Sequence, residues 1–205
     1  MAKVGPSPDP LTAGSFYVLS TVYIAVLTEK SEQTTTLRTV RIPRELDSAL
    51  ETISREKGLS VNSFVSILLK KYVEWDKYAE RFGYITLTRE SLRRILNATD
   101  HNKLIESAQD YGSNVPKEFL MFWFKELNID SVLAALSLRC KYANVAEYEL
   151  KIDGKNYMII LHHDLGIMWS EFLGYTLQQE IKIVLQVLAR LEISRNSVVL
   201  KFHLP

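Results

Sequence analysis

Two side chains with directional hydrogen-bonding groups, Thr39 and Arg41, stand two positions apart in a short stretch of alternating residues. In an extended strand both point to one face, while Val40 and Ile42 point to the other. A guanidinium can hold guanine O6 and N7 with two hydrogen bonds, and threonine offers a hydroxyl and a methyl group. Leu37 shares this face and can contact a thymine methyl. These three residues therefore favour the reading of base edges in a DNA groove.

Two further groups have the chemistry to hold a DNA backbone. Arg38 lies off the base-reading face, so we expect it to reach a phosphate. Ser60 is the expected N-cap of a helix, and the amides of Val61 and Asn62 at its open start form an anion site with it. We expect this site to clamp a backbone phosphate.

One strand and two helices are predicted to position these groups. Pro43 suits the first turn of a helix, and Glu45 places a negative charge at the positive end of its dipole. Apolar residues recur at helical spacing until Gly58, where a left-handed residue ends the helix. A second helix starts after Ser60, runs on to about Arg81 and is broken by Gly83. Its apolar residues are Phe64, Ile67, Leu68, Tyr72 and Trp75.

The predicted strand has no partner nearby in its own sequence, which would leave its backbone groups unpaired. Two chains related by a two-fold axis solve this by pairing their strands antiparallel and burying both chains' helices in a common core. The resulting two-stranded ribbon fits the major groove of double-stranded DNA. We therefore expect a homodimer, or a higher oligomer built from it.

The stretch from Thr36 to about Trp75 resembles the ribbon-helix-helix family of DNA-binding proteins, of the CopG and Arc types. The likeness is carried by Pro-Arg-Glu at 43–45 and by Gly-Leu-Ser-Val-Asn-Ser at 58–63, in that order. It implies that the ribbon binds operator DNA as a dimer and that neighbouring dimers cooperate. The chain departs from the family at Leu37, where a polar residue is commoner, and at Arg38, where an apolar one is.

Charge and composition bound the remaining possibilities. The chain of 205 residues has a net charge of +1, and residues 36–75 hold seven basic against five acidic residues. Any DNA affinity must therefore come from local placement of charge. The content of 47% hydrophobic residues leaves room for a second core. The one cysteine, Cys140, excludes an internal disulfide, fits a reducing cytoplasm and is expected in the core.

Three segments are predicted. Residues 1–34 are a disordered or uncertain extension, 35–81 the ribbon-helix-helix domain and 82–205 an α+β domain for assembly or sensing. The apolar run Phe16 to Leu27 is too short to span a bilayer and lacks a clear cleavage site, so we expect a cytoplasmic protein without a membrane partner. An upstream translation start or an extra strand explains the run equally well.

The fold class is predicted as α+β, in which several helices are followed by a small antiparallel sheet with one long packed helix. The expected helices are one capped by Thr88, His101 to Tyr111 closed by Gly112, Val115 to Leu127, Ser131 to Tyr142, and Trp169 to about Leu188. The expected strands are Glu147 to Ile152, Tyr157 to His162, and two near Leu191 to Ile193 and Val198 to Phe202, with a hairpin turn at Asp153-Gly154.

Two other clusters could carry chemistry. His162, His163 and Asp164 are consecutive metal-ligand types, but adjacent strand residues face opposite sides, so we expect no metal site and instead one buried histidine, one exposed histidine and a capping Asp164. The aromatic run 122–124 is expected to supply core and dimer contacts, with a small-molecule pocket as the alternative. No phosphate loop, nucleophile elbow or paired Cys-x-x-Cys occurs, so we expect neither an enzyme nor a cofactor.

The sequence thus predicts a dimeric, sequence-specific transcriptional regulator, most simply a repressor, with an unidentified effector of its C-terminal domain. Two alternatives stay open. An antitoxin would share the DNA-binding half and embrace a toxin with its C-terminal part. An interaction protein would use the ribbon-helix-helix only to dimerise and would lack sequence-preferring, salt-dependent DNA affinity.

Overall fold

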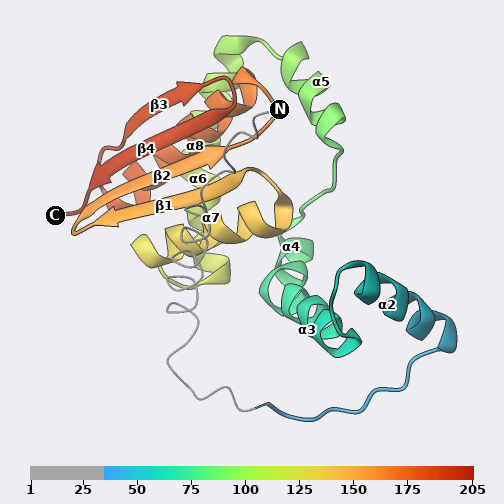
Figure 1. The fold of residues 1–205 in the computed structure, drawn as a ribbon. Coiled ribbons are helices and arrows are strands. Elements are labelled where there is room, and N and C mark those ends of the chain that lie inside the picture. The colour runs from blue at the N-terminus through green and yellow to red at the C-terminus, as the bar shows by residue number, and fades with distance from the viewer. Residues whose placement is uncertain (1–34) are drawn as a thin grey trace, which may run out of the picture.

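The structure, a computed structural model, describes residues 35–205 (Figure 1). The predicted extension 1–34, with its apolar run, lies outside the described residues. The helices are α2 (Arg44–Glu56), α3 (Val61–Lys71), the π-helix η1 (Tyr72–Asp76), α4 (Lys77–Phe82), α5 (Arg89–Ala98), α6 (His101–Trp123), α7 (Ile129–Ala143) and α8 (Ile167–Leu185). The strands are β1 (Glu147–Asp153), β2 (Asn156–His162), β3 (Arg190–Ser194) and β4 (Ser197–His203).

The four strands form one antiparallel sheet in the order β1-β2-β4-β3. A two-residue turn joins β1 to β2, and Gly154 has the positive φ of 56° that such hairpin turns require. Residues alternate in burial along the central strands, so that Ile159 and Leu161 of β2 lie beside Val198 and Leu200 of β4 on one buried face. The predicted strands and their hairpin are confirmed, as is the α+β class.

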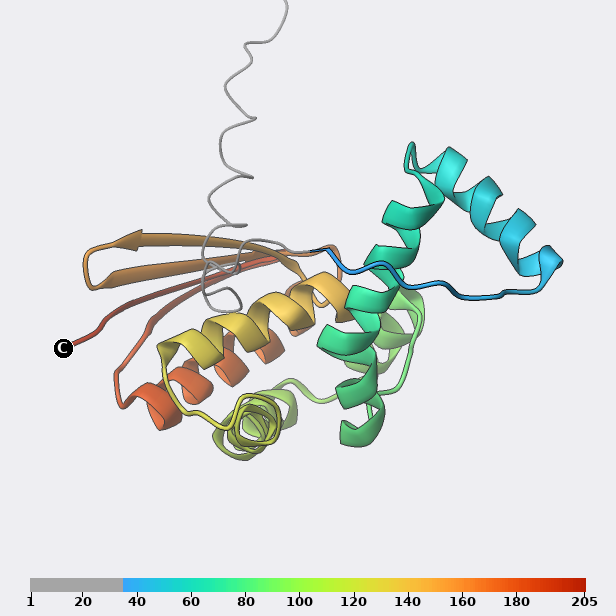
Figure 2. The same ribbon diagram turned by 90° about the horizontal axis from the view of Figure 1, so that it is seen from below.

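Helices cover the buried face of the sheet in two layers (Figure 2). Helices α7 and α8 lie directly on it, and their apolar residues join the strand residues in one core. Helix α6 packs on the far side of α8. Cys140 of α7 belongs to this core, and its burial raises the pKa of the thiol to about 12, which confirms the prediction of a core cysteine.

One prediction for this region is wrong. Gly112 was expected to end a helix, but α6 runs unbroken through both Gly112 and Pro116. The glycine serves close packing instead, since a Cβ there would lie 2.4 Å from the carbonyl oxygen of Thr176 in α8. The close contact between α6 and α8 therefore requires a glycine at position 112. The sequence alone does not distinguish a glycine needed for packing from one that ends a helix.

The helices of the N-terminal part begin and end where the sequence predicts. Pro43 precedes α2, and the helix ends at Gly58 with a φ of 65° and a bond from the Leu59 amide to the Ser54 carbonyl. Ser60 caps α3 by accepting a hydrogen bond from the Ser63 amide at 3.1 Å. Helix α3 continues through η1 and α4 to Phe82, and Gly83 follows in the left-handed conformation.

Elsewhere the structure refines the predicted bounds. Thr88 caps α5, and a capping box between Asn128 and Ser131 starts α7 slightly earlier than expected. Helix α8 starts two residues before Trp169 and ends at Leu185. Within residues 35–205 no helix has the length and apolar character needed to cross a bilayer.

Candidate nucleic-acid interface

The three residues expected to read bases project from the segment that precedes α2. Leu37 is 91% exposed, and Thr39 and Arg41 are exposed as well. Residues 35–43 have no regular secondary structure in the single chain, and no backbone hydrogen bond pairs residues 35–42 with another described segment. Figure 1 shows this stretch running extended beside the helices. The predicted strand stays a prediction, because a strand needs a partner and residues 35–205 bring none to it.

The expected phosphate-binding groups lie at the start of α3. The first bonds of this helix run from the Ser63 amide to the Ser60 hydroxyl and from the Phe64 amide to the Ser60 carbonyl. The amides of Val61 and Asn62 therefore precede its bonded part and lie at the positive end of the dipole. Arg38 is exposed on the extended segment. That these groups contact phosphate stays a prediction.

The helices of this part bury little of their own apolar surface. Leu50 of α2 and Phe64 of α3 are buried, yet Val40 is 75% exposed and apolar residues of both helices are exposed too. We call these exposed residues the open apolar face. Its members in the single chain are Val40, Ile42, Leu46, Ile53, Ile67, Leu68, Leu69, Tyr72 and Val73. Several large apolar residues exposed on neighbouring elements are typical of a surface that contacts another molecule.

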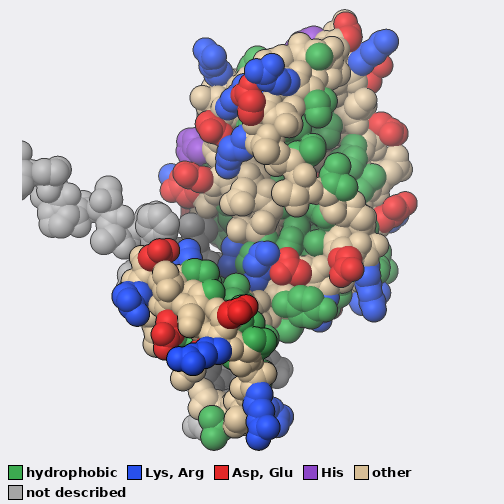
Figure 3. Space-filling view, turned by 90° about the vertical axis from the view of Figure 1, so that its right-hand side faces the viewer, with side chains coloured by type: hydrophobic (Ala, Val, Ile, Leu, Met, Phe, Trp, Pro, Cys, Tyr) green, Lys and Arg blue, Asp and Glu red, His purple; other side chains and the backbone are tan. Residues whose placement is uncertain are grey.

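Charge on this side of the molecule is mixed. Figure 3 shows basic and acidic side chains interspersed with hydrophobic ones, without a broad basic surface. The view agrees with the near-neutral composition of the chain. The DNA contact predicted from the sequence therefore rests on individual placed residues such as Arg41.

The helix behind the interface is fixed to the rest of the protein by aromatic packing. Trp75 of η1 is buried against Trp123 of α6 at 5.2 Å between ring centroids and against Tyr142 of α7 at 6.1 Å. Tyr78 of α4 packs on Trp123 and meets Phe122 edge-on. Phe122 and Trp123 thus join α6 to the N-terminal helices, and Trp123 and Phe124 pack partly buried against a core cluster, which confirms the expected core role for these two residues. A dimer role for the run 122–124 stays a prediction.

A polar contact accompanies this packing. Glu74 of η1 accepts a hydrogen bond from the Tyr142 hydroxyl at 2.7 Å and from the Lys141 ammonium at 3.2 Å. Burial raises the pKa of the Glu74 carboxyl, but the Tyr142 hydrogen bond and the charges of Lys141 and Lys70 outweigh it, and the pKa is lowered. Glu74 is therefore ionised at neutral pH and holds η1 to α7.

The segment His162 to Asp164 is structural. The Leu165 amide donates to Nδ1 of His163, so the proton lies on Nε2, which donates to the Ser170 hydroxyl at 2.8 Å. Burial lowers the pKa of His163, so the ring is neutral, and both nitrogens are engaged. His162 is exposed. No group of three or more His, Cys, Asp or Glu side chains in residues 35–205 is arranged to hold a metal ion.

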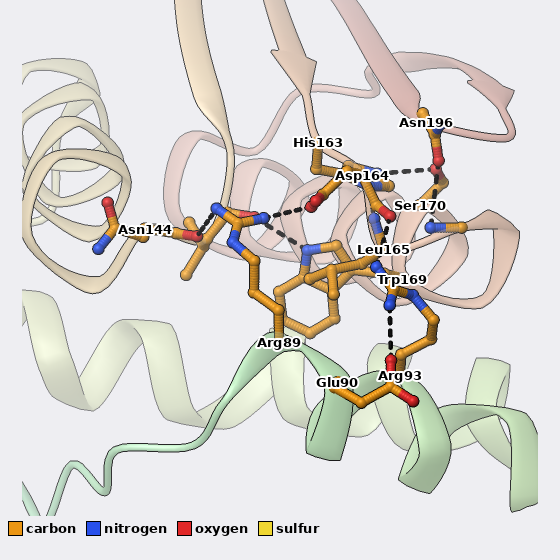
Figure 4. Close-up of polar contacts among 12 residues, drawn as sticks. Arg89, Glu90, Arg93, Asn144, His163, Asp164, Leu165, Trp169, Ser170 and Asn196 are labelled. Atoms are coloured by element: carbon orange, nitrogen blue, oxygen red, sulfur yellow. Dashed lines mark hydrogen bonds and ion pairs between the residues drawn. The ribbon is translucent and has the colours of Figure 1, made fainter.

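Asp164 was predicted to cap the turn that precedes the long helix, and the structure gives its carboxylate a partner in another helix. The N-cap of α8 is Gly166, and no side chain caps the helix there. Asp164 instead forms an ion pair with Arg89 at the start of α5, and its carbonyl accepts a hydrogen bond from Arg93 at 3.1 Å (Figure 4). The Arg89 guanidinium also reaches the Asn144 carbonyl at 3.4 Å. These contacts fasten α5 to the turns that flank β1 and α8.

Sequence reasoning missed the roles of Arg89 and Glu74, although one signal was available. A basic residue in the first turn of a helix opposes the helix dipole, so Arg89 needs an outside partner to be favourable there. The partner, Asp164, lies 75 positions away in the sequence.

The chain matches no protein-family model and no curated protein.

Proposed function

We propose that the protein is a sequence-specific DNA-binding regulator, a repressor that acts as a homodimer of the ribbon-helix-helix type in the cytoplasm. In this proposal residues 35–43 of two chains pair as antiparallel strands and enter the major groove of double-stranded DNA. Thr39, Arg41 and Leu37 then face the bases. Arg38 and the start of α3 at Ser60, Val61 and Asn62 face phosphates.

The observation that carries the proposal is the joint occurrence of the open apolar face and an extended segment that has no strand partner within residues 35–205. Val40 and Ile42 belong to that segment, Ile67 and Leu68 belong to α3, and Tyr72 is the first residue of η1. A second copy of the chain satisfies both needs at once, since antiparallel pairing of the two segments brings the two sets of helices together. The same pairing turns Thr39 and Arg41 outward on one side of the ribbon.

The aromatic packing of η1 and α4 connects the DNA-binding part to the C-terminal domain, and the two parts have different roles in this proposal. Trp75 and Tyr78 pack on Trp123 and so connect the helix of the DNA-binding part to α6 of the C-terminal domain. We assign to the C-terminal domain the assembly of dimers or the sensing of an effector.

Binding of the full-length chain to its own upstream DNA, followed by fluorescence anisotropy at two salt concentrations with scrambled DNA as competitor, tests the function. Tight binding that resists the competitor is expected. Arg41→Ala should weaken binding to the cognate site by about 1–3 kcal/mol and leave binding to scrambled DNA nearly unchanged. The matched control is Arg94→Ala, an exposed arginine of α5 outside the ribbon.

The alternatives give different results. An equal loss on cognate and scrambled DNA would exclude base reading by Arg41. Weak binding that salt removes, with the dimer intact, would indicate a module used only for dimerisation. A small protein that co-purifies with the C-terminal domain would favour an antitoxin.

A further inference from the structure

A cavity of about 570 Å³ lies between the helix of the DNA-binding part and the C-terminal domain. Its walls are η1 and α4 on one side, the turn between α7 and β1 on the other, and the segment 83–88 that links α4 to α5. This volume falls in the range of about 300–1,000 Å³ that is usual for small-molecule sites. The function proposed above makes no use of it.

The walls of the cavity are rich in aromatic rings. Trp75 and Tyr84 line it, with their ring centroids 5.0 Å apart, and Tyr142 and Trp169 line it from the C-terminal domain. The Trp169 ring is held in place because its Nε1 donates to the Val145 carbonyl at 2.9 Å. Aromatic faces held in this way favour a ligand with a flat apolar ring.

Charged side chains of both signs line the same cavity. Lys71 and Asp76 form an ion pair with each other at 3.0 Å, which leaves Arg89 and Glu80 to meet a ligand. The Arg89 guanidinium donates to Asp164 and to the Asn144 carbonyl (Figure 4). Its remaining N–H groups can donate to a ligand. Among residues 35–205 the carboxylate of Glu80 forms no ion pair and accepts no hydrogen bond from a side chain. The cavity thus offers one cation and one anion beside its rings.

We propose that this cavity binds a zwitterion with a flat ring, of the class of the aromatic amino acids. The carboxylate of the ligand meets Arg89, its ammonium meets Glu80, and its ring lies among Trp75, Tyr142 and Trp169. Because the walls belong both to η1 and α4 and to the C-terminal domain, the bound ligand contacts both parts. We assign this ligand the role of the effector. That role rests on the DNA-binding function proposed above, whereas binding of the ligand to the cavity does not.

Calorimetric titration of the full-length chain with L-tryptophan, L-phenylalanine and L-tyrosine, in the absence of DNA, tests the site. At least one amino acid should bind. For tryptophan, removal of the carboxylate in tryptamine or of the ammonium in indole-3-propionate should weaken binding about tenfold or more.

Two variants assign the charged contacts. Glu80→Gln should weaken binding of the amino acid about tenfold while leaving indole-3-propionate, which has no ammonium, unchanged. Arg89→Gln should weaken the amino acid likewise and leave tryptamine unchanged. The matched controls are Glu118→Gln on α6 and Arg190→Gln on β3, both exposed. Because Glu80 is exposed and the substitution keeps its shape, this variant tests the site even if Arg89→Gln unfolds the protein.

The two proposals fail separately. No heat with any of the three amino acids at millimolar concentration, or binding that neither Glu80→Gln nor Arg89→Gln alters, would overturn the site and leave DNA binding untouched. Amino-acid binding that does not change the anisotropy titration with DNA would overturn the effector role alone.

Discussion

The hydroxyl of Tyr142 donates a hydrogen bond to the carboxylate of Glu74 over 2.7 Å, and this contact joins α7 of the C-terminal domain to the π-helix behind α3. The two residues are 68 positions apart in the sequence. The contact lies beside the buried Trp75, so polar and aromatic interactions fix the same junction.

Tyr142→Phe should destabilise the protein by about 1.5 kcal/mol at pH 7, because a largely buried carboxylate loses a hydrogen bond. The pKa of Glu74 is lowered in the folded protein. Its ionised form therefore contributes to the free energy of unfolding at pH values above the ordinary carboxyl pKa, and this contribution is lost as the pH falls through the folded pKa. Urea unfolding at several pH values from 7 into the acid range measures this effect. The difference in free energy of unfolding between the unsubstituted protein and Tyr142→Phe should shrink as the pH falls. Lys70→Ala, which removes only an exposed partner of Glu74, should cost less than about 0.5 kcal/mol.

Gly112→Ala should destabilise the protein by about 1–3 kcal/mol, because the added methyl group meets the backbone of Thr176 and forces α6 and α8 apart. Thermal unfolding measures the change. Asn114→Ala, exposed on the same helix, is the control and should have little effect. A stabilisation by Gly112→Ala, as expected for a simple gain in helix propensity, would contradict the close packing.

Arg139 and Glu180 form a buried ion pair between α7 and α8 at 3.0 Å, and Glu180 is 1% exposed. Arg139→Met should cost about 3–5 kcal/mol, because it leaves a buried carboxylate without a partner. The double variant Arg139→Met with Glu180→Met should recover much of this loss, since apolar groups of similar size replace both charges. Chemical denaturation of the three proteins measures the effect, and a double variant no more stable than the single one would contradict it.

Leu68→Asp should dissociate the proposed dimer. Each chain of the dimer would lose one buried leucine, and burial of a leucine contributes about 1.5–3 kcal/mol. The dissociation constant of the dimer should therefore rise about 100-fold or more. Sedimentation at several concentrations measures it. Leu188→Asp is the matched control, because this leucine is 81% exposed and lies outside the open apolar face. An unchanged dimer in Leu68→Asp would place the interface elsewhere.

Local signals in the sequence were sufficient for much of the fold. Proline, serine and glycine at 43, 60 and 58 mark helix ends because their backbone preferences act within a few residues. Alternation at Glu147 to Ile152, the turn signal after it and the apolar run Tyr157 to His162 indicated the first hairpin of the sheet, which the structure confirms. The α+β class and the core position of Cys140 followed from these patterns.

Contacts between distant residues were beyond such reasoning. Gly112 was read as a terminator because the Thr176 backbone that requires a glycine lies 64 positions later. Asp164 was read as a cap because its partner, Arg89, is remote in sequence. The residues proposed to contact DNA were predicted from the sequence, whereas the cavity behind them was not, since its walls come from four separate segments.

The sequence by itself determined the order and type of most helices and strands and many of their ends, because these features depend on neighbours within about one turn. The tertiary structure decided which elements touch. It brought Glu74 to Tyr142 and Arg89 to Asp164, and it left the residues of the open apolar face exposed. Packing is a property of pairs of surfaces, so only their arrangement in space shows which surfaces are satisfied and which still need a partner.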